Sequence, residues 1–509
     1  MGKRPNILIF MTDQEQADVV APDHPCLTPH ADRLAQEGIR FDHMFTCTAH
    51  CCPSRASFHT GVYPSRHGIF NNVCTPTAIN TGLEPGTPTF SEQLREAGYD
   101  LVFCGKWHVS REEGPADRGW EELLVTAGKG QVRGHQQSLE RWRSFIPEPK
   151  GPRRPGQIFR PGWGHYQLYG VRDAEYEEMG DYRTVHRAID ALPRLAKRGT
   201  PWCLFIGPSG PHDPFIVPRR FVELYEGVGV PLPPNYGDNL EDKPRIYQRM
   251  RGQYWSQLSE EEVRESVRYY WAYCTMMDAL FGDVLETLDA TGQAEDTLVL
   301  FLSDHGEYGG AHGLYMKGVP AFREAYHVPC IARWPRGMVD PGRVADAFIT
   351  HTDFAATFRD LAGLHGLDEP DSRSLRPFFE NRTPEEWRDA HFTQFNGVEL
   401  YYSQRTVMTR DYKYVYNGFD FDELYDLRND PHEMRNVADD LAYEDVKHEL
   451  VRWMWRFAAE QEDERLFNPY GTVAIAPWGP GDALGAEETP HYRMERALCH
   501  STMDGSAGP

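Results

Sequence analysis

Four short apolar runs, each bounded by glycine, proline or polar residues, constrain the fold of this chain more than any other feature. They span residues 5–12, Asp100–Cys104, Trp202–Ile206 and Thr297–Ser303. Runs of this length are typical of buried strands. The segments between them carry helical patterns, and strands that alternate with helices predict a mostly parallel sheet covered by helices on both faces. In that architecture the chemistry gathers beyond the carboxyl ends of the strands.

Two of the intervening helices have clear start signals. The first is expected to begin with Thr28 as N-cap and Pro29 at the first helical position, and to end at Gly38. The second begins at a capping box formed by Ser259 and Glu262. Its apolar residues fall on one stripe at helical spacing: Val263, Val267, Tyr270, Trp271, Cys274, Met277 and Phe281.

The pattern changes at about residue 388. Short strands are expected there, before a helix around Tyr443–Ala459: Phe392–Phe395, Tyr401–Thr409 and Tyr412–Tyr416. This pattern predicts a small antiparallel sheet with one packed helix. The expected organisation is therefore a large α/β domain, a small antiparallel subdomain and a tail, over residues 1–385, 386–465 and 466–509.

Residues 125–195 interrupt the α/β pattern with glycine, proline, tryptophan and many basic residues. We interpret this range as an insertion, which is either a solvated loop or part of the rim of a substrate pocket. Loops added to a rigid scaffold commonly carry recognition. The candidates for the rim are basic and aromatic: Arg141, Trp142, Arg143, Arg153, Arg154, Trp163 and His165.

Charge and hydropathy exclude some classes of partner. The formal net charge of −23 would repel nucleic acid or an anionic membrane surface. Any anionic substrate must therefore enter a local basic pocket. The apolar run Ile7–Met11 is too short for a signal peptide, and no stretch reaches the ~18 apolar residues of a membrane helix. The ten cysteines resemble reduced thiols more than a disulfide framework, so we expect a cytoplasmic protein.

Polar residues follow two of the apolar runs directly. Asp13 and Gln14 come after the first run, and Asp304 and His305 come after the last. Two strand ends that each deliver adjacent ligands can converge on one divalent cation. Oxygen ligands favour Ca²⁺, Mg²⁺ or Mn²⁺, whereas the imidazole of His305 makes a purely hard ion less favourable. Each pair alone is a weak indication, because an Asp at a strand end is more often a cap or turn residue.

A more specific motif lies between them: Cys51-Cys52-Pro53-Ser54-Arg55, followed after four residues by Thr60-Gly61. Adjacent cysteines could be buried or could bind zinc, but no second Cys/His pair stands at finger spacing. The motif resembles the signature of the formylglycine-dependent sulfatases of the alkaline phosphatase superfamily. In that family a maturation enzyme oxidises the first cysteine, here Cys51, to formylglycine.

A hydrated aldehyde suits sulfuryl transfer better than a thiol. One of its hydroxyls can attack sulfur, and the second can expel sulfate afterwards. A cation and a nearby arginine lower the pKa of the attacking hydroxyl. Arg55 lies on the same face as Cys51 if a helix starts at the motif, and a helix N-terminus also favours an anionic intermediate.

Four further segments resemble the same family in the expected order: Gly105-Lys106-Trp107-His108, Pro211-His212-Asp213-Pro214, Gly310–Lys317 and Glu423–Leu427. The resemblance implies that Lys106 and Lys317 bind the sulfate. It implies that His108 supports the formylglycine hydrate and acts as a base, and that His212 protonates the leaving group. His312 is left open between structural support and substrate contact, and the last segment is interpreted as structural.

The sequence departs from the commonest arylsulfatase pattern at Gln14 and His305, where Asp and Asn are frequent. It is more similar to the branch that holds phosphonate monoester hydrolases, choline sulfatases and certain sugar sulfatases. The resemblance implies an alkaline-phosphatase-like sandwich, with a large mixed, mostly parallel sheet between helices and a small C-terminal antiparallel sheet domain. The expected metal ligands are Asp13, Gln14, Cys51, Asp304 and His305.

The resulting hypothesis is a sulfatase that hydrolyses a small-molecule or short sugar sulfate ester. It would use one divalent cation, with Ca²⁺ the first expectation and Mn²⁺ or Mg²⁺ the alternatives. The alternative on the same residues is a phosphonate monoester hydrolase or phosphodiesterase. An alternative of another class is a binding protein on an inactive scaffold, with Cys51 unmodified. A homo-oligomer is left open.

Overall fold

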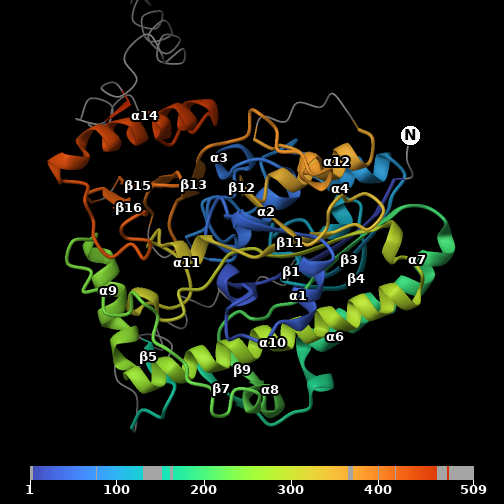
Figure 1. Ribbon diagram of the computed structural model, residues 1–509, viewed down its shortest axis with the longest axis horizontal. Helices are drawn as coiled ribbons and strands as arrows, with labels where there is room; N and C mark the ends of the chain where they lie inside the picture. The colour runs from blue at the N-terminus through green and yellow to red at the C-terminus, as the bar shows by residue number, and fades with distance from the viewer. Residues whose placement is uncertain are drawn as a thin grey trace, which may run out of the picture.

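A computed structural model describes residues 4–75, 77–129, 152–160, 164–364, 371–398, 401–418, 420–466 and 479–480. A mixed eight-stranded sheet forms its centre, in the order β12-β2-β11-β10-β1-β8-β3-β4 (Figure 1). The strand bounds are β1 Asn6–Thr12, β2 Ile39–Met44, β3 Asp100–Lys106, β4 Glu121–Thr126, β8 Trp202–Gly207, β10 Thr297–Ser303, β11 Cys330–Arg333 and β12 Arg343–Ile349. Only β11 runs antiparallel to its neighbours in this sheet, which confirms the predicted mixed, mostly parallel arrangement.

The four apolar runs form the four adjacent strands β10, β1, β8 and β3. These strands are parallel to one another, so their carboxyl ends lie at one edge of the sheet. Every residue of β8 and β10 is buried. Continuous apolar runs are expected for strands covered on both faces. The sequence pattern therefore identified the centre of the sheet.

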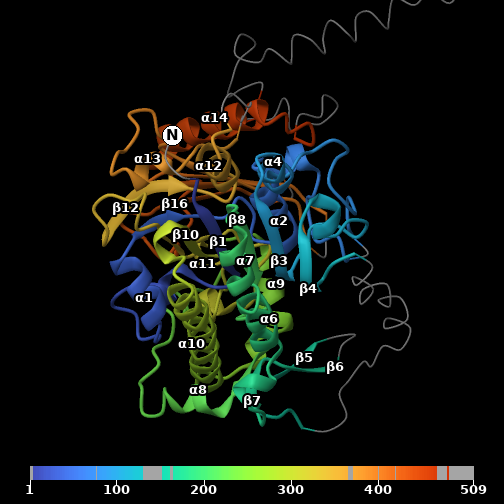
Figure 2. The ribbon, with the colours of Figure 1, turned by 90° about the vertical axis from the view of Figure 1, so that its right-hand side faces the viewer.

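Helices cover both faces of the sheet (Figures 1 and 2). One face carries α1 (Pro29–Gln36), α6 (Gly180–Ile189) and α10 (Glu260–Ala290). The other carries α2 (Cys51–Thr60), α4 (Phe90–Glu96) and α12 (Asp353–Leu361). The site described below lies at the edge between these two layers.

The two predicted helix starts are confirmed, with one change of capping group. Ser259 and Glu262 form the capping box of α10, with the Glu262 amide 3.3 Å from Ser259 Oγ. Thr28 precedes α1 but makes no side-chain cap hydrogen bond. The amides of His30 and Ala31 instead donate to the Asp278 carboxylate at 3.0 and 2.8 Å. A residue of α10 therefore caps α1, because an acceptor from a neighbouring helix can replace the local one.

A second, four-stranded antiparallel sheet follows the large one, as predicted. It comprises β13 (His391–Phe395), β14 (Gln404–Met408), β15 (Tyr412–Asn417) and β16 (Glu423–Asp426). The helix α14 (Glu444–Glu460) packs on this sheet through a separate apolar cluster that includes Leu450 and Trp455. The segment 423–427 has the structural role expected for it, because it supplies the edge strand β16.

The range 125–195 is only partly described by the structure. It contains β5 (Gln157–Arg160), which pairs with β6 (Gly164–Gln167), then β7 (Tyr169–Arg172), which pairs with β9 (Phe215–Pro218). Near the end of the range, α6 packs against β3 and β8 and belongs to the helical layer of the sheet. Four rim candidates lie outside the described residues: Arg141, Trp142, Arg143 and Trp163.

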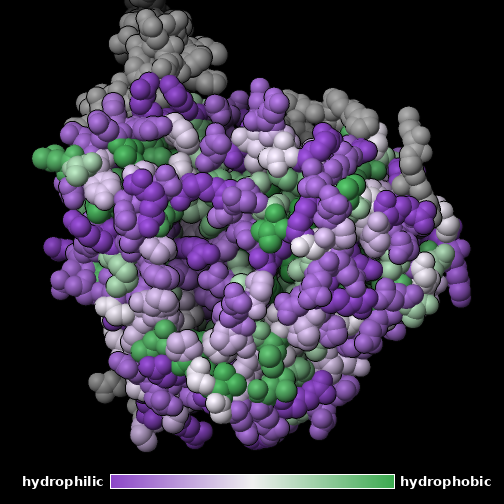
Figure 3. All heavy atoms as spheres, in the orientation of Figure 1, coloured by the Kyte–Doolittle hydropathy of each residue, from purple (hydrophilic) through white to green (hydrophobic). Residues whose placement is uncertain are grey.

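The face drawn in Figure 3 is mostly hydrophilic, with apolar side chains in separate small groups. Within the described residues, no helix combines the length and apolar character that a membrane span requires. The cysteines in these residues are buried thiols: Cys26, Cys47, Cys51, Cys52, Cys74, Cys104, Cys203, Cys274 and Cys330. The described part of the chain thus shows no disulfide framework.

Candidate active site

Two central strands deliver the first four site residues. Thr12 and Ser303 are paired in register at the ends of β1 and β10. The residues that follow them are therefore neighbours, and the backbone amide of Gln14 donates to Oδ1 of Asp304 at 3.2 Å. All four predicted ligands at these strand ends are fully buried: Asp13, Gln14, Asp304 and His305.

The helix α2 brings the cysteine motif to the same edge of the sheet. It begins at Cys51 and ends at Thr60, and the next residue, Gly61, has a φ of 78°, a left-handed conformation that favours glycine. Arg55 lies one turn after Cys51, as predicted. Its guanidinium contacts both strand-end carboxylates, with Nε 2.8 Å from Asp304 Oδ2 and Nη2 3.2 Å from Asp13 Oδ2. These ion pairs anchor the first turn of α2 over the strand ends.

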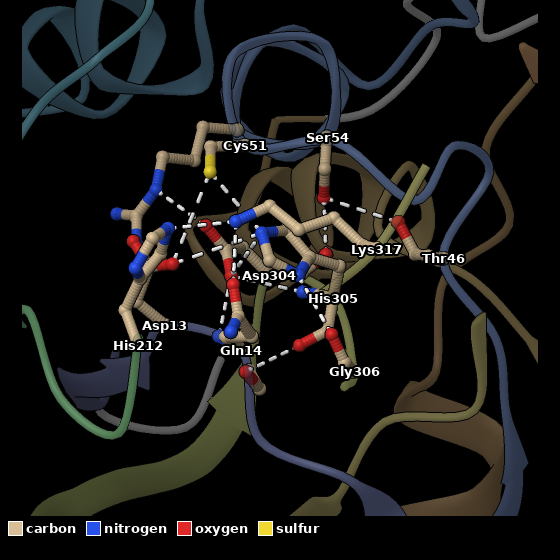
Figure 4. A network of polar contacts seen from close by, with 12 residues as sticks. Asp13, Gln14, Thr46, Cys51, Ser54, His212, Asp304, His305, Gly306 and Lys317 are labelled. Carbon is tan, nitrogen blue, oxygen red and sulfur yellow. Dashed lines mark hydrogen bonds and ion pairs between the residues drawn. The ribbon is translucent and has the colours of Figure 1, made fainter. Parts of the chain in front are cut away.

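Four side chains form a group that could hold a metal ion (Figure 4). The ligand atoms of Asp13, Cys51, Asp304 and His305 all lie within 4.8 Å of one another. Nε2 of His305 lies 3.1 Å from Cys51 Sγ and 3.7 Å from Asp13 Oδ1. Nδ1 of His305 lies 2.9 Å from the Gly306 carbonyl oxygen, which can only accept, so Nδ1 carries the proton and Nε2 offers its lone pair to the group. Buried carboxylate oxygens and a free imidazole nitrogen fit a divalent cation.

Two lysines border this group. Lys106 ends β3, and its ammonium pairs with Oδ2 of Asp13. Nζ of Lys317 lies 2.5 Å from Gln14 Oε1 and 2.6 Å from Nε2 of His212 (Figure 4). The structure thus places both predicted sulfate-binding lysines beside the predicted metal ligands. About 30% of the His212 side chain is exposed, whereas Cys51 is buried, so the site is open on the His212 side.

His108 is buried and lies next to Cys51 and Cys74. It follows β3 with a φ of 52°, a left-handed conformation that is uncommon outside glycine. Its Nε2 lies 3.2 Å from Sγ of Cys74. Burial and Lys106 lower its pKa, but interactions with the sulfur atoms of Cys51 and Cys74 outweigh them and raise it. Cys74 is a neighbour of the site that the sequence did not indicate.

The electrostatics of the site favour anions. Burial raises the pKa of the Cys51 thiol, but Lys106, Lys317 and nearby histidines outweigh burial and bring it well below its ordinary value. Burial also opposes ionisation of Asp13, yet Lys106, His212 and Arg55 hold its pKa low. A nucleophile at position 51 would therefore be stabilised as an anion.

His212 is held in a defined orientation. Its Nδ1 lies 2.8 Å from the Asp213 carbonyl oxygen, so Nε2 faces Lys317 and the opening of the site. Burial and Lys317 lower the pKa of His212, whereas Asp213, Cys51 and Asp13 raise it by more, and its pKa lies above the ordinary value. A raised pKa suits a proton donor at neutral pH.

His312 takes a structural position. It is fully buried and stacks on Phe322 with ring centroids 3.5 Å apart. Its Nδ1 lies 2.7 Å from Asp238 Oδ2, and its Nε2 lies 2.9 Å from Asn235 Nδ2. Both ring nitrogens are thus engaged with protein groups, which settles the open alternative in favour of structural support.

The described rim candidates differ from one another. Arg153 makes a bidentate ion pair with Glu262 at 2.6 and 2.7 Å, which links the insertion to the start of α10. Arg154 is exposed. His165 lies in β6 next to Tyr166, whose hydroxyl donates to Oδ2 of Asp213. Tyr166 therefore connects the insertion to the site, although no motif had marked it.

The mixed sheet, the small second sheet and the buried ionic group at the strand ends define an enzyme with the alkaline-phosphatase-like α/β fold. Residues 5–364 match the sulfatase family, and residues 310–460 match the family "N-sulphoglucosamine sulphohydrolase, C-terminal". The chain belongs to the sulfatase family and is an enzyme of that family.

Known relatives span most of the chain. It is 30% identical over 464 residues to a choline-sulfatase of Rhizobium meliloti (strain 1021), which covers 86% of this chain and 83% of the relative. The phosphonate monoester hydrolase of Agrobacterium radiobacter superposes with a TM-score of 0.74 at 24% identity, covering 90% of this chain and 96% of that one. A structure solved in complex with its substrate D-glucosamine-2-N,6-O-disulfate has a TM-score of 0.69 at 22% identity, covering 91% and 99%. At these identities the two structures support the fold alone.

Proposed function

We propose that this chain hydrolyses a sulfate ester to an alcohol and inorganic sulfate, with Cys51 converted to formylglycine by a maturation enzyme. One observation carries the proposal: Cys51 begins α2 and faces the group of Asp13, Asp304 and His305. Arg55 and Lys106 add positive charge beside these carboxylates. Family membership and this arrangement support the same chemistry.

Two groups supply chemistry that the twenty ordinary side chains lack. A divalent cation held by Asp13, Gln14, Asp304 and His305, beside residue 51, would supply Lewis acidity at the sulfate. Hydrated formylglycine would supply one hydroxyl to attack sulfur and a second whose deprotonation expels the sulfate and restores the aldehyde. We propose Ca²⁺ first, and Mn²⁺ or Mg²⁺ next, because most of the donors are oxygens.

The side chains of the protein perform the remaining tasks. Lys106 and Lys317 neutralise sulfate oxygens and stabilise the charge that builds on them in the transition state. His212 gives a proton to the ester oxygen as the S–O bond breaks, since it lies at the open side of the site. His108 accepts the proton of the second hydroxyl when sulfate leaves. Arg55 holds Asp13 and Asp304 in place.

The decisive experiment is peptide mass spectrometry of the chain produced together with a maturation enzyme, combined with an aryl sulfatase assay. We expect formylglycine at Cys51 and an unmodified thiol at Cys52, because only Cys51 stands two residues before Pro53. Full sulfatase activity with an intact Cys51 thiol would refute the proposal. Chelation should abolish the activity, and re-addition of each candidate cation would identify the most effective one.

The alternative is phosphonate monoester or phosphodiester hydrolysis by the same residues. It is favoured by Gln14 and His305, the two positions at which the sequence is more similar to the branch that holds phosphonate monoester hydrolases. Rates on matched aryl sulfate and phenyl phosphonate esters separate the two. A higher kcat/KM on the phosphonate would assign the chain to this alternative.

The substrate class and location complete the proposal. We infer a small-molecule or short sugar sulfate ester, which is consistent with the choline-sulfatase relative and the structure solved with a sulfated glucosamine. We also propose a cytoplasmic location, supported by the buried thiols of the described residues, which suit a reducing compartment. Fractionation of the source cells tests the location.

A further inference from the structure

The amide of Gln14 makes three contacts that fix its orientation. Its nitrogen Nε2 donates to Asp213 Oδ1 at 2.9 Å and to Glu307 Oε2 at 2.5 Å. Its oxygen Oε1 accepts from Lys317 Nζ at 2.5 Å. An amide nitrogen has two protons, and each of them here faces a carboxylate. If the amide were rotated by half a turn, its oxygen would face two carboxylates and no proton would lie between them.

Both carboxylates are themselves fixed from the far side. Oε1 of Glu307 accepts from the amides of Gly309 and Met316 at 2.9 and 2.5 Å, and Oδ2 of Asp213 accepts from the Tyr166 hydroxyl. Each acid therefore presents its other oxygen to Gln14. Glu307 accepts from the backbone amide of Met316, the residue directly before Lys317. It therefore also fixes the backbone next to Lys317.

Glu307 meets three N–H donors, which suits an ionised carboxylate. No hydrogen-bond acceptor contacts its oxygens in the described part of the chain, so the geometry describes the ionised form. A glutamine at this position could not satisfy the same donors, because one of its two terminal atoms is itself a donor.

We propose that Asp213 and Glu307 are positioning residues that clamp the Gln14 amide, so that its carbonyl oxygen and never its NH₂ group faces the cation. The clamp allows a neutral side chain to replace a carboxylate as ligand, since an amide that rotated freely would present a donor half of the time. Glu307 also links Gln14 to the segment before Lys317, because it contacts the Gln14 side chain and the Met316 backbone amide. The importance of the cation for catalysis rests on the proposed function, but the clamp concerns cation binding alone.

The test measures cation binding without substrate. Metal-stripped full-length protein is titrated with Ca²⁺ and with Mn²⁺ by calorimetry, and the bound metal is counted after dialysis. Partners that orient metal ligands are typically worth about 10- to 100-fold in affinity. We therefore expect Glu307→Gln and Asp213→Asn each to weaken binding by about 10-fold or more. Glu15→Gln is the matched control: Glu15 is equally buried, and no hydrogen bond joins its carboxylate to the Gln14 amide.

A reversed pair makes the test specific to the clamp. In the double variant Gln14→Glu/Glu307→Gln, the new glutamine can donate its NH₂ group to the carboxylate introduced at position 14 and still accept from Gly309 and Met316 through its oxygen. Gln14→Glu alone places a third carboxylate against Asp213 and Glu307. The change at position 14 should thus raise cation affinity in the Glu307→Gln background and lower it, or leave it unchanged, in the wild-type background.

The outcomes separate cleanly. Wild-type affinity in Glu307→Gln and Asp213→Asn, an equal effect of Gln14→Glu in both backgrounds, or a wild-type chain that binds no divalent cation would each overturn the clamp. If Glu307→Gln fails to fold by circular dichroism, Asp213→Asn provides the same comparison. A chain that passes these binding tests but cleaves no sulfate ester would refute the proposed function and leave the clamp standing.

Discussion

Arg55 and Asp304 form a fully buried ion pair, with Nε of the guanidinium 2.8 Å from Oδ2 of the carboxylate. The same guanidinium lies 3.2 Å from Asp13. Arg55 thus neutralises two buried carboxylates that would otherwise repel each other. A buried charge without a partner is costly, so this arginine contributes to the stability of the fold as well as to the site.

Arg55→Met should therefore destabilise the metal-free protein. Removal of one partner from a buried ion pair typically costs roughly 3–5 kcal/mol, and we expect a loss of this order in the free energy of unfolding. Saturating Ca²⁺ should recover part of it, because the cation neutralises the same carboxylates. Urea denaturation with and without Ca²⁺ measures both effects. Unchanged stability, or a loss that Ca²⁺ does not reduce, would contradict this interpretation.

The second prediction concerns the nucleophile. Cys51→Ala should abolish turnover, because it removes the nucleophile. It should keep the fold, because it removes only one sulfur atom. Cys51→Ser keeps one hydroxyl but lacks the second hydroxyl, whose deprotonation would expel the sulfate. It should therefore accumulate a serine sulfate ester on incubation with substrate. Intact-mass measurement shows the adduct, and sustained turnover by Cys51→Ser would rule out the role of the second hydroxyl.

Much of the fold could be predicted because its central strands are buried on both faces. β8 and β10 are wholly buried, so their apolar runs are continuous and easy to recognise. The strands that were not predicted give weaker signals. β12 alternates buried and exposed residues along its first half, and β11 is four residues long. Short or half-exposed strands lack the continuous apolar pattern that marks a strand covered on both faces.

The site could be predicted wherever its residues stand next to one another in the sequence. Asp13 with Gln14, and Asp304 with His305, follow strands directly, so sheet topology brings them together. Contacts between distant segments gave no such signal. Cys74 contacts His108, and Tyr166 contacts Asp213, only because segments from different parts of the chain pack together.

The third prediction concerns acid stability. Burial lowers the pKa of His67 to about 3, and its Nδ1 accepts from the Ile69 amide at 3.1 Å. Its folded pKa lies below the unfolded value of about 6.5, so the folded state binds fewer protons between these two values. The stability contribution of His67 is therefore complete above about pH 6.5 and is lost as the pH falls toward 3.

One such group changes the free energy of unfolding by about 1.4 kcal/mol per pH unit within this window. His67→Gln should therefore be less stable than the wild type at pH 7 and show a shallower loss of stability between pH 6 and 4. Urea denaturation at several pH values gives the two slopes. Equal slopes in the two proteins would show that His67 does not stay neutral in the folded state.

The fourth prediction tests His212 as the proton donor. An ester with a good leaving group, such as 4-nitrophenyl sulfate, needs little protonation of its oxygen, whereas an alkyl or sugar ester needs it. General acid catalysis contributes typically about 10²- to 10⁴-fold. His212→Asn should therefore lower kcat/KM by about 10²-fold or more for an alkyl sulfate and by much less for the nitrophenyl ester. An equal loss on both esters would indicate that His212 binds the sulfate instead.

The last prediction concerns recognition of the leaving group by the insertion. Arg153 and Arg154 are adjacent, but their surroundings differ. Arg153 is committed to the ion pair with Glu262, whereas Arg154 is exposed and its guanidinium is available. The hairpin of β5 and β6 that follows them reaches the site, because Tyr166 donates to Asp213. A substrate that extends beyond the sulfate could therefore meet this part of the insertion, whereas a minimal aryl sulfate could not.

If the insertion contacts the leaving group, Arg154→Gln should raise KM for the natural ester or a sugar ester several-fold. It should leave KM for 4-nitrophenyl sulfate unchanged. Arg153→Gln is the matched control, since it removes the same charge one residue away but breaks a structural ion pair. Its effect should appear as lower thermal stability and be similar for both esters. If Arg154→Gln changes neither ester, or both equally, then the charges of this segment only offset the acidic surface, and recognition of the leaving group must lie on another part of the rim.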